Sequence, residues 1–94
     1  MLNDFLMEKD PRVVLREEFD QWGILFNPDT SEVVSINAMG IDIWKLIAGR
    51  CSLKDVMQGI QAQYDQVPAE AQEQINTFVN ELIKRGFIKN LSKE

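Results

Sequence analysis

The fold is decided by the stretch Val33-Val34-Ser35-Ile36-Asn37, in which a short β-branched run meets a single asparagine. Valine and isoleucine favour strands because their branched side chains pack well on a pleated surface. Asparagine is a preferred N-cap residue, and apolar residues at helical spacing follow it as far as Gly49. We therefore expect a strand to end and a helix to begin at Asn37, with a β-rich half before it and a helical half after it.

Before this junction, the sequence predicts three strands joined by short turns. The strands cover residues 12–19, 22–27 and 32–36, and the turn before the third has the sequence Pro28-Asp29-Thr30-Ser31. Proline presets φ in such a turn, and short polar side chains bond to the nearby backbone. Three strands connected in this way form an antiparallel meander. Gly23, in the second strand, indicates a bulge or a close backbone approach.

After the junction, the apolar spacing predicts three helices. The first runs from Asn37 to Gly49, the second begins at the capping-box-like Ser52-Leu53-Lys54-Asp55, and the third runs from about Pro68 to Arg85. We therefore expect an α+β, winged-helix-like fold in which an N-terminal three-stranded antiparallel sheet is followed by three helices.

The two ends of the chain give weaker patterns. Residues 1–10 mix apolar and polar side chains ahead of Pro11, and residues 89–94 are mostly polar. Chain termini are commonly loose. We expect residues 1–10 to be flexible or loosely packed, residues 11–88 to form the domain, and residues 89–94 to form a polar tail.

The composition limits the classes of function. The chain has 94 residues and a net charge of −5, which suits one small domain and disfavours binding to nucleic acid. It has no histidine and a single cysteine, Cys51, which excludes an internal disulfide and a thiolate or imidazole zinc site. No apolar run reaches the roughly 20 residues of a membrane span, and the N-terminus lacks a signal-peptide pattern. We expect a cytoplasmic protein that binds no metal, cofactor, nucleic acid or membrane.

Residues suited to catalysis are scarce. Cys51 stands at the start of a predicted helix, where a thiol pKa can be lowered, and it is either a reactive thiol or a small residue in a turn. Glu17 and Glu18 would point to opposite faces of a strand, so they are poorly placed to hold one ion. Asp29-Thr30-Ser31-Glu32 lacks the ligand set and the glycine of a calcium loop. We expect a protein that is not an enzyme.

The predicted shape points to a binding role. If the third strand is outermost, the backbone N–H and C=O groups of residues 32–36 are unpaired, and an extended peptide can pair with them. Alternate side chains of that peptide would lie in a groove beside the third helix. The alternative is an edge that is merely short and twisted, or one that the N-terminal segment covers. The composition does not decide between them.

The stretch from Ile36 to Val56, with the sequence INAMGIDIWKLIAGRCSLKDV, resembles the central signature of the PqqD-like family. In that family a Leu-Asn pair starts a helix, an Ile-Leu pair and a Leu lie on its inner face, a glycine ends it, and a Ser/Thr-Val/Leu pair opens the next helix. Gly40 and Ala48 depart from the pattern, which usually has alanine and aspartate there, and we expect neither position to contact a ligand. The resemblance extends over nearly the whole chain, to Pro11-Arg12, Tyr64, Phe78, Leu82, Gly86, Phe87 and Ile88.

The resemblance implies a RiPP recognition element. Such a protein is a peptide-binding chaperone that holds the leader of a ribosomally made precursor peptide and presents it to a modifying enzyme, often a radical SAM protein. In the family, the leader adds as a strand beside the third strand and against the third helix. Carried onto this chain, the resemblance gives the strand residues Glu32, Val33, Val34, Ser35 and Ile36, and the helix residues Gln74, Ile75, Phe78, Val79 and Leu82.

Two other functions fit the same pattern. A winged-helix transcription regulator would read DNA with its third helix, which requires basic or amide side chains near the helix start. Here that region is the acidic Ala69-Glu70-Ala71-Gln72-Glu73. An interaction subunit would instead pair its exposed strand with a second copy of the chain. For the chaperone we expect a monomer or a weak homodimer.

Overall fold

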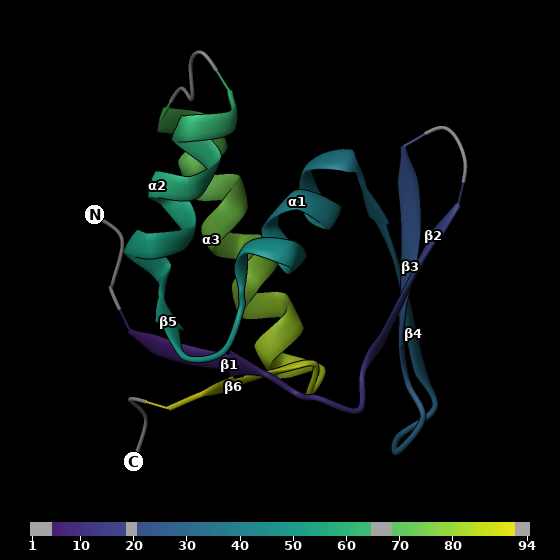
Figure 1. Cartoon of the computed structure of the whole chain (residues 1–94). Helices are drawn as coiled ribbons and strands as arrows, with labels where there is room; N and C mark the ends of the chain where they lie inside the picture. The colour runs from purple at the N-terminus through teal and green to yellow at the C-terminus, as the bar shows by residue number, and fades with distance from the viewer. Residues whose placement is uncertain (1–4, 19–20, 65–68, 92–94) are drawn as a thin grey trace.

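The front half of the chain forms the antiparallel meander that the sequence predicts, and three helices follow it (Figure 1). The structure is a computed structural model that describes residues 5–18, 21–64 and 69–91. The three predicted strands are β2, β3 and β4, and the α+β class is confirmed. In chain order the elements are β1 (Leu6–Lys9), β2 (Val14–Glu18), β3 (Trp22–Asn27), β4 (Glu32–Asn37), α1 (Ala38–Leu46), β5 (Cys51–Ser52), α2 (Leu53–Gln63), α3 (Ala69–Lys84) and β6 (Ile88–Asn90).

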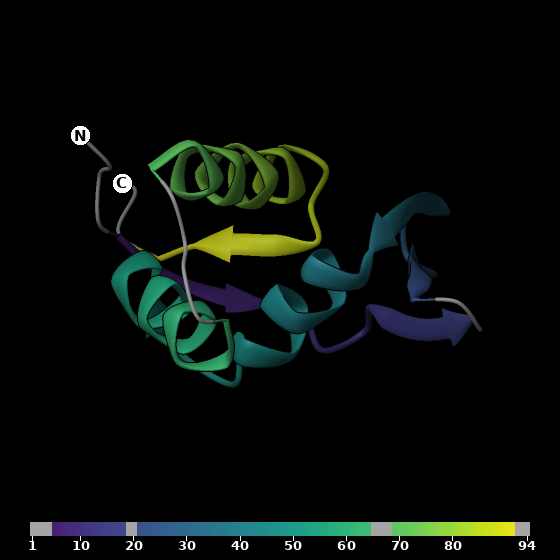
Figure 2. The same ribbon diagram turned by 90° about the horizontal axis from the view of Figure 1, so that it is seen from above.

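The elements are arranged in two lobes. A small sheet with the order β5-β1-β6 lies across the base of α2 and α3, and the meander stands on the other side of α1 (Figure 1). Seen from above, α3 lies beside β6, and α2 lies on the side of β1 (Figure 2). Because β4 leads directly into α1, this helix connects the lobes.

The meander has the order β2-β3-β4 and a continuous register. Leu25 lies opposite Leu15 on one side and Val34 on the other. Side chains alternate between the two faces of a sheet, so these three point toward the core. A Cβ atom at Gly23 would lie 3.3 Å from the Ile41 side chain of α1. The Arg16 carbonyl oxygen of β2 would lie 3.0 Å from the same Cβ atom, so the close backbone approach predicted for Gly23 is confirmed, and the register passes through it without a bulge.

Asn37 ends β4 and caps α1, as the sequence predicts. Its side chain accepts a hydrogen bond from the Gly40 backbone N–H at 2.8 Å. This bond satisfies one of the amide groups that the first turn of a helix leaves unpaired. The strand and the helix therefore join without a loop.

The end of α1 comes earlier than the predicted Gly49. The helix ends at Leu46, and the backbone N–H of the next residue, Ile47, donates hydrogen bonds to the carbonyl groups of Ile43 and Trp44. The ammonium group of Lys9 in β1 donates to the same Trp44 carbonyl at 3.0 Å and lies 4.8 Å from the Trp44 ring centroid. Burial lowers the pKa of this ammonium group. β1 thus supplies a cap for α1.

The predicted capping box of α2 is confirmed. The Ser52 side chain accepts from the Asp55 amide, and the Asp55 carboxylate accepts from the Ser52 amide, each at 3.1 Å. At the other end of α2, the Tyr64 hydroxyl donates to the Asp42 carboxylate of α1 at 2.7 Å. This hydrogen bond, with burial, raises the pKa of Tyr64. It fastens α2 to α1.

The expectation of a flexible or loosely packed segment at residues 1–10 is wrong for residues 6–10, while residues 1–4 lie outside the described part of the chain. β1 is the central strand of the small sheet, where Met7 lies opposite Cys51 of β5 and Asn90 of β6. Met7 is 0% exposed and Asp10 is also buried. The partners of β1 are far from it along the sequence, so no turn or neighbouring strand marks it as a strand. The mixed apolar and polar composition of the segment gave no alternating pattern either.

The expectation of a polar tail at residues 89–94 also needs correction. Ile88–Asn90 form β6, in which Lys89 lies opposite Glu8 of β1. Opposite charges facing each other across an antiparallel pair favour the pairing. The predicted return of Phe87 and Ile88 to the core is confirmed, since both are buried. Residues 92–94 are outside the described part.

A cluster of charged side chains fixes the corner between the two sheets. The Asp10 carboxylate accepts hydrogen bonds from the backbone amide of Arg12 at 2.9 Å and from its guanidinium group at 3.0 and 3.1 Å. The same guanidinium group pairs with Asp29 in the turn between β3 and β4. These hydrogen bonds from Arg12 lower the pKa of Asp10. The cluster connects β1 to the far end of the meander.

The burial of β1 predicts a strong effect of shortening Met7. We expect Met7→Ala to lower the free energy of unfolding by about 2–5 kcal/mol, as large-to-small substitutions in a core do. Leu6→Ala is the matched control in the same strand, because Leu6 is 44% exposed, and we expect a much smaller loss. Urea unfolding followed by circular dichroism measures both. Equal, small losses for the two variants would contradict the placement of β1 in the core.

Candidate functional site

The outer edge of β4 is open within the described part of the chain. β4 is the last strand of the meander, and among the described strands it pairs with β3 alone. Apart from bonds within the sheet, no backbone hydrogen bond among the described residues involves Val33, Val34 or Ser35. An edge strand leaves part of its N–H and C=O groups without a partner. β4 therefore offers backbone groups to a further strand.

The opposite edge of the meander, β2, is built differently. Arg16 and Glu18 of β2 form an ion pair with each other, and Glu17 pairs with Lys45 of α1. Charged side chains on an edge strand oppose the addition of another strand. β4 has no charged side chain after Glu32. Of these two edges, β4 is the better suited to accept a guest strand.

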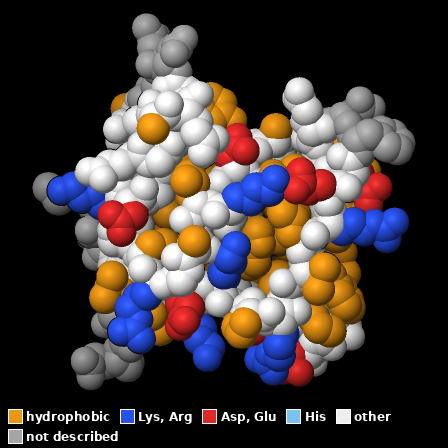
Figure 3. Space-filling model, viewed as in Figure 1, with side chains coloured by type: hydrophobic (Ala, Val, Ile, Leu, Met, Phe, Trp, Pro, Cys, Tyr) orange, Lys and Arg blue, Asp and Glu red, His pale blue; other side chains and the backbone are white. Residues whose placement is uncertain are grey.

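The face of the meander that points away from the core is partly apolar. Val14, Phe26 and Val33 are neighbours in one row across the three strands, with exposed fractions of 53%, 39% and 52%. Trp22 is exposed on the same face. Hydrophobic side chains are visible at the surface on this side of the molecule, at the right of Figure 3, beside charged ones. A strand added to β4 would extend this face.

α3 presents two different faces. One face carries Ile75, Val79 and Leu82, which are buried in the core. The other is mainly polar, and its residues lie three or four positions apart, which places them on one side of a helix. They line a shallow hollow and comprise Glu70, Glu73, Gln74, Thr77, Phe78 and Glu81.

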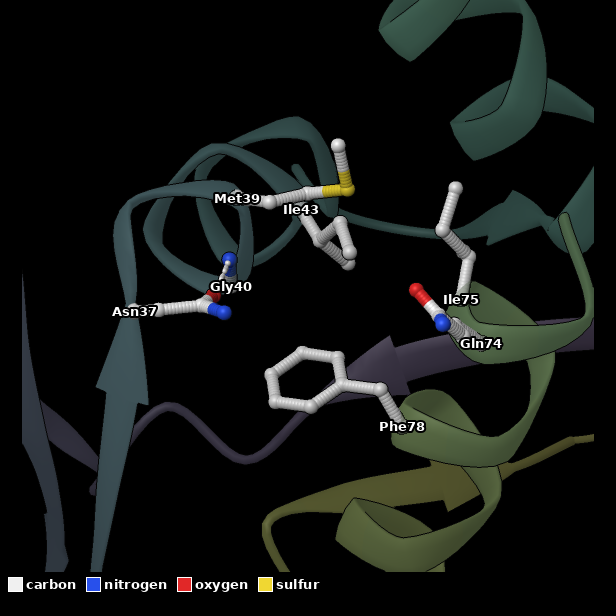
Figure 4. A pocket seen from close by; sticks show the side chains of 7 residues that line it. All are labelled: Asn37, Met39, Gly40, Ile43, Gln74, Ile75 and Phe78. Atoms are coloured by element: carbon white, nitrogen blue, oxygen red, sulfur yellow. Dashed lines mark hydrogen bonds between the residues drawn. The ribbon is translucent and has the colours of Figure 1, made fainter. Parts of the chain in front are cut away.

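A pocket of about 110 Å³ lies where β4, α1 and α3 meet. Figure 4 shows the Phe78 ring extending from α3 toward Asn37 at the end of β4, with Met39 and Ile43 of α1 nearby. A cavity of about 150 Å³ holds a benzene molecule, so this pocket is large enough for one aliphatic side chain. Its wall consists of Asn37, Met39, Gly40, Ile43, Gln74, Ile75 and Phe78.

At Gly40, α1 comes close to its neighbours in this wall. A Cβ atom there would lie 2.9 Å from the Ile36 Cβ and 3.2 Å from the Phe78 ring. The alanine that is usual in the family pattern would therefore force Phe78 or Ile36 to shift. Position 40, which we expected to have no contact with a ligand, forms part of the pocket wall. Ala48, the other departure, is exposed.

At the other end of this surface, an ion pair joins Arg85, the residue after α3, to β4. The Arg85 guanidinium group lies 3.3 Å from the Glu32 carboxylate and 3.4 Å from that of Glu81. Partly exposed pairs of this kind contribute only about 0–1 kcal/mol to stability. The main effect of this pair is to hold the end of α3 next to the start of β4. Thr30 and Lys84 complete this end. The surface between β4 and α3, from the pocket wall to the Glu32–Arg85 pair, is called the β4–α3 groove below.

The five predicted strand residues all lie in β4. Glu32, Val33 and Ser35 are exposed, whereas Val34 is partly buried and Ile36 is buried, so the side chains of these two face the core. Their backbone groups remain part of the strand edge.

The five predicted helix residues divide between the groove and the core. Gln74 and Phe78 line both the pocket and the hollow beside it. Ile75 is buried and forms part of the pocket wall. Val79 and Leu82 are 0% and 1% exposed, so the expectation that their side chains line a groove does not fit, because they fill the core.

Sequence reasoning missed two groups of groove residues. One is Met39 and Ile43 of α1, which the apolar pattern assigned to the helix without indicating that they wall a pocket. The other is the polar stripe of α3, which includes Glu70, Glu73, Thr77 and Glu81. The spacing of that stripe is readable in the sequence, but only the topology reveals that it borders β4.

Cys51 is buried in β5, and burial raises the pKa of its thiol. This favours the interpretation of Cys51 as a small packed residue over that of a reactive thiol. Across the residues that the structure describes, no group of His, Cys, Asp and Glu side chains is arranged to hold a metal ion. None of the described helices is both long and apolar enough to cross a membrane.

Comparison with known proteins identifies the family. The family model described as "Coenzyme PQQ synthesis protein D (PqqD)" matches residues 23–88, which is more than half of the chain. The chain belongs to the PqqD family. The matched region begins within β3 and includes β4, α1, α2 and α3, and therefore both sides of the groove.

The fold of this PqqD family member is similar to a solved structure described as "TbiB1 in Complex with the TbiA(beta) Leader Peptide". The TM-score is 0.70 and the sequence identity is 17%, over 92% of this chain and 99% of that chain. At this level of identity the likeness concerns the fold. The comparison with curated proteins gave no match.

The two faces of α3 in this PqqD family member predict effects of very different size for two alanine substitutions. We expect Leu82→Ala to lower the free energy of unfolding by about 2–5 kcal/mol because it leaves a cavity in the core. We expect Gln74→Ala, on the groove face, to change it by less than about 0.5 kcal/mol. Thermal and urea unfolding measure both. Similar losses for the two variants would show that the faces are assigned wrongly.

Proposed function

We propose that this chain is a non-catalytic chaperone that binds the leader of a ribosomally made precursor peptide and presents it to a modifying enzyme. The leader adds as a strand to β4 and places a side chain in the pocket beside Phe78. The observation that carries the proposal is the open edge of β4 beside the β4–α3 groove. Membership of the PqqD family supports it, as does the likeness to the TbiB1 structure, which is a complex with a leader peptide.

Backbone pairing alone does not account for tight binding. Four or five backbone hydrogen bonds contribute about 2–7 kcal/mol, and association itself costs at least about 4 kcal/mol in lost freedom of motion. One apolar side chain buried in the pocket adds about 1.5–3 kcal/mol. In strand addition the backbone bonds supply part of the affinity and the side-chain pockets supply the specificity. The pocket is therefore where the leader is distinguished from other extended peptides.

The modifying enzyme in this proposal is a radical SAM enzyme. A chaperone that holds the leader while it contacts the enzyme converts the second encounter into an intramolecular one and raises the local concentration of the precursor. In the proposal the chain does this as a soluble monomer or weak homodimer. The apolar outer face of the meander, next to the added strand, remains accessible while the leader is bound.

The proposal predicts binding of a neighbouring precursor. We expect the leader of a short precursor peptide encoded beside this gene to bind with a Kd of about 10 μM or tighter, measured by isothermal titration calorimetry, and a scrambled leader to bind much more weakly. Failure of every neighbouring precursor to bind at about 100 μM would contradict the proposed function.

The same titration also tests strand addition. Backbone N-methylation at alternate leader residues removes the amides that face β4, and we expect it to weaken binding at least about ten-fold. Methylation of the intervening residues, which face away, serves as the control. Equal sensitivity of both sets would contradict pairing with β4 while leaving leader binding in place.

A further inference from the structure

The two ends of the β4–α3 groove carry different charges. At the end near the N-terminus of α3, Glu70 and Glu73 are exposed. Neither has a cationic partner within the described part of the chain, where the ion pairs involve other residues. At the opposite end, Lys84 and Arg85 stand beside the start of β4. There the Arg85 charge is shared between Glu32 and Glu81.

The hollows between these ends form one continuous surface. Gln74 and Phe78 belong both to the pocket and to the acidic hollow. Glu81 belongs both to the acidic hollow and to the end at Lys84 and Arg85, where two cationic side chains face the carboxylates of Glu32 and Glu81. A peptide that lies along β4 and continues past Asn37 therefore passes each of these groups in turn.

α3 extends beyond the end of β4 along the groove. The start of β4 lies at Arg85 and its end lies at the pocket beside Phe78, so α3 and β4 run in opposite directions. From Glu70 to Lys84, α3 extends about 21 Å at 1.5 Å per residue. Glu70 and Glu73 precede Phe78 by about 8–12 Å along α3, so they lie beyond the end of β4. A guest strand of seven or eight residues that continues past Asn37 reaches both ends of the groove.

We propose that this charge difference selects the guest and fixes its direction. The guest carries Lys or Arg facing Glu70 and Glu73, then an apolar residue in the pocket, and then Asp or Glu facing Lys84. Antiparallel pairing is slightly more stable than parallel pairing, so the guest begins near Asn37, and the order from its N-terminus is basic, apolar, acidic. This inference rests on the proposed function, because it assumes that the groove holds an extended peptide.

The expected size of the effect follows from the exposure of the groups. Each exposed ion pair changes affinity by about two- to five-fold, and salt weakens it further. Glu70 also lies in the first turn of α3, where a carboxylate favours the start of a helix. Any test must therefore separate an effect on helix stability from an effect on peptide choice.

Selection from a library of short random peptides displayed on phage separates an effect on helix stability from an effect on peptide choice. The targets are the wild-type protein, the variant Glu70→Lys/Glu73→Lys, and the control Glu17→Lys/Glu18→Lys, which makes the same charge change on β2 at the other edge of the meander. We expect the wild type and the control to enrich peptides in which Lys or Arg precedes an apolar residue. We expect the groove variant to lose this preference and to enrich Asp or Glu at those positions.

Each outcome has a separate meaning. Peptides without a charge preference in the wild type, or the same peptides from all three targets, would overturn this inference while leaving the proposed function intact. No enrichment by the wild type over an empty surface would contradict the proposed function itself. If the lysine variant fails to fold, Glu70→Gln/Glu73→Gln replaces it, and we expect that variant to lose the basic preference without acquiring an acidic one. A basic preference that persists there would also overturn the inference.

Discussion

The hydrogen bond from the Gly40 amide to the Asn37 side chain determines how the two lobes meet. It ends β4 and begins α1 at one residue, so no loop separates the strand from the helix. The pocket forms in the corner that results, with Asn37 and Gly40 in its wall and Phe78 of α3 opposite. An N-cap of this kind contributes about 1 kcal/mol to stability. Its greater consequence is geometric, because a guest strand on β4 would reach the pocket without changing direction.

An open strand edge with apolar residues is a risk for a soluble protein, because it invites pairing between copies. In β2, the charged residues Arg16, Glu17 and Glu18 oppose pairing with a second copy. β4 lacks that protection along Val33, Val34 and Ser35. The net charge of −5 opposes the approach of a second copy, and β4 is short. The contrast between the two edges of one sheet is a physical reason to regard β4 as a binding edge.

Local patterns in the sequence were sufficient for the meander, the Asn37 junction and the Ser52–Asp55 capping box, because each depends on residues that are close together along the chain. β1 was not predictable in this way, since Met7 pairs with Cys51 and Asn90. The site was predictable only in part. The strand at residues 32–36 is present and lies at the edge of its sheet, and its role in binding stays a prediction. Apolar residues of α3 were assigned to the groove, although Val79 and Leu82 fill the core. Hydrophobicity alone does not tell a core face from a binding face, and the polar stripe beside β4 becomes visible only once the strand and the helix are placed together.

The central claim is that backbone groups of β4 are unpaired and available to a guest strand. Hydrogen exchange of the β4 amides, followed by NMR with and without a neighbouring precursor peptide, tests this most directly. We expect alternate amides of residues 33–36 to exchange rapidly in the free protein and to become protected when the peptide saturates the groove. Slow exchange of all four amides in the free protein, or no change in their exchange at saturation, would contradict the account.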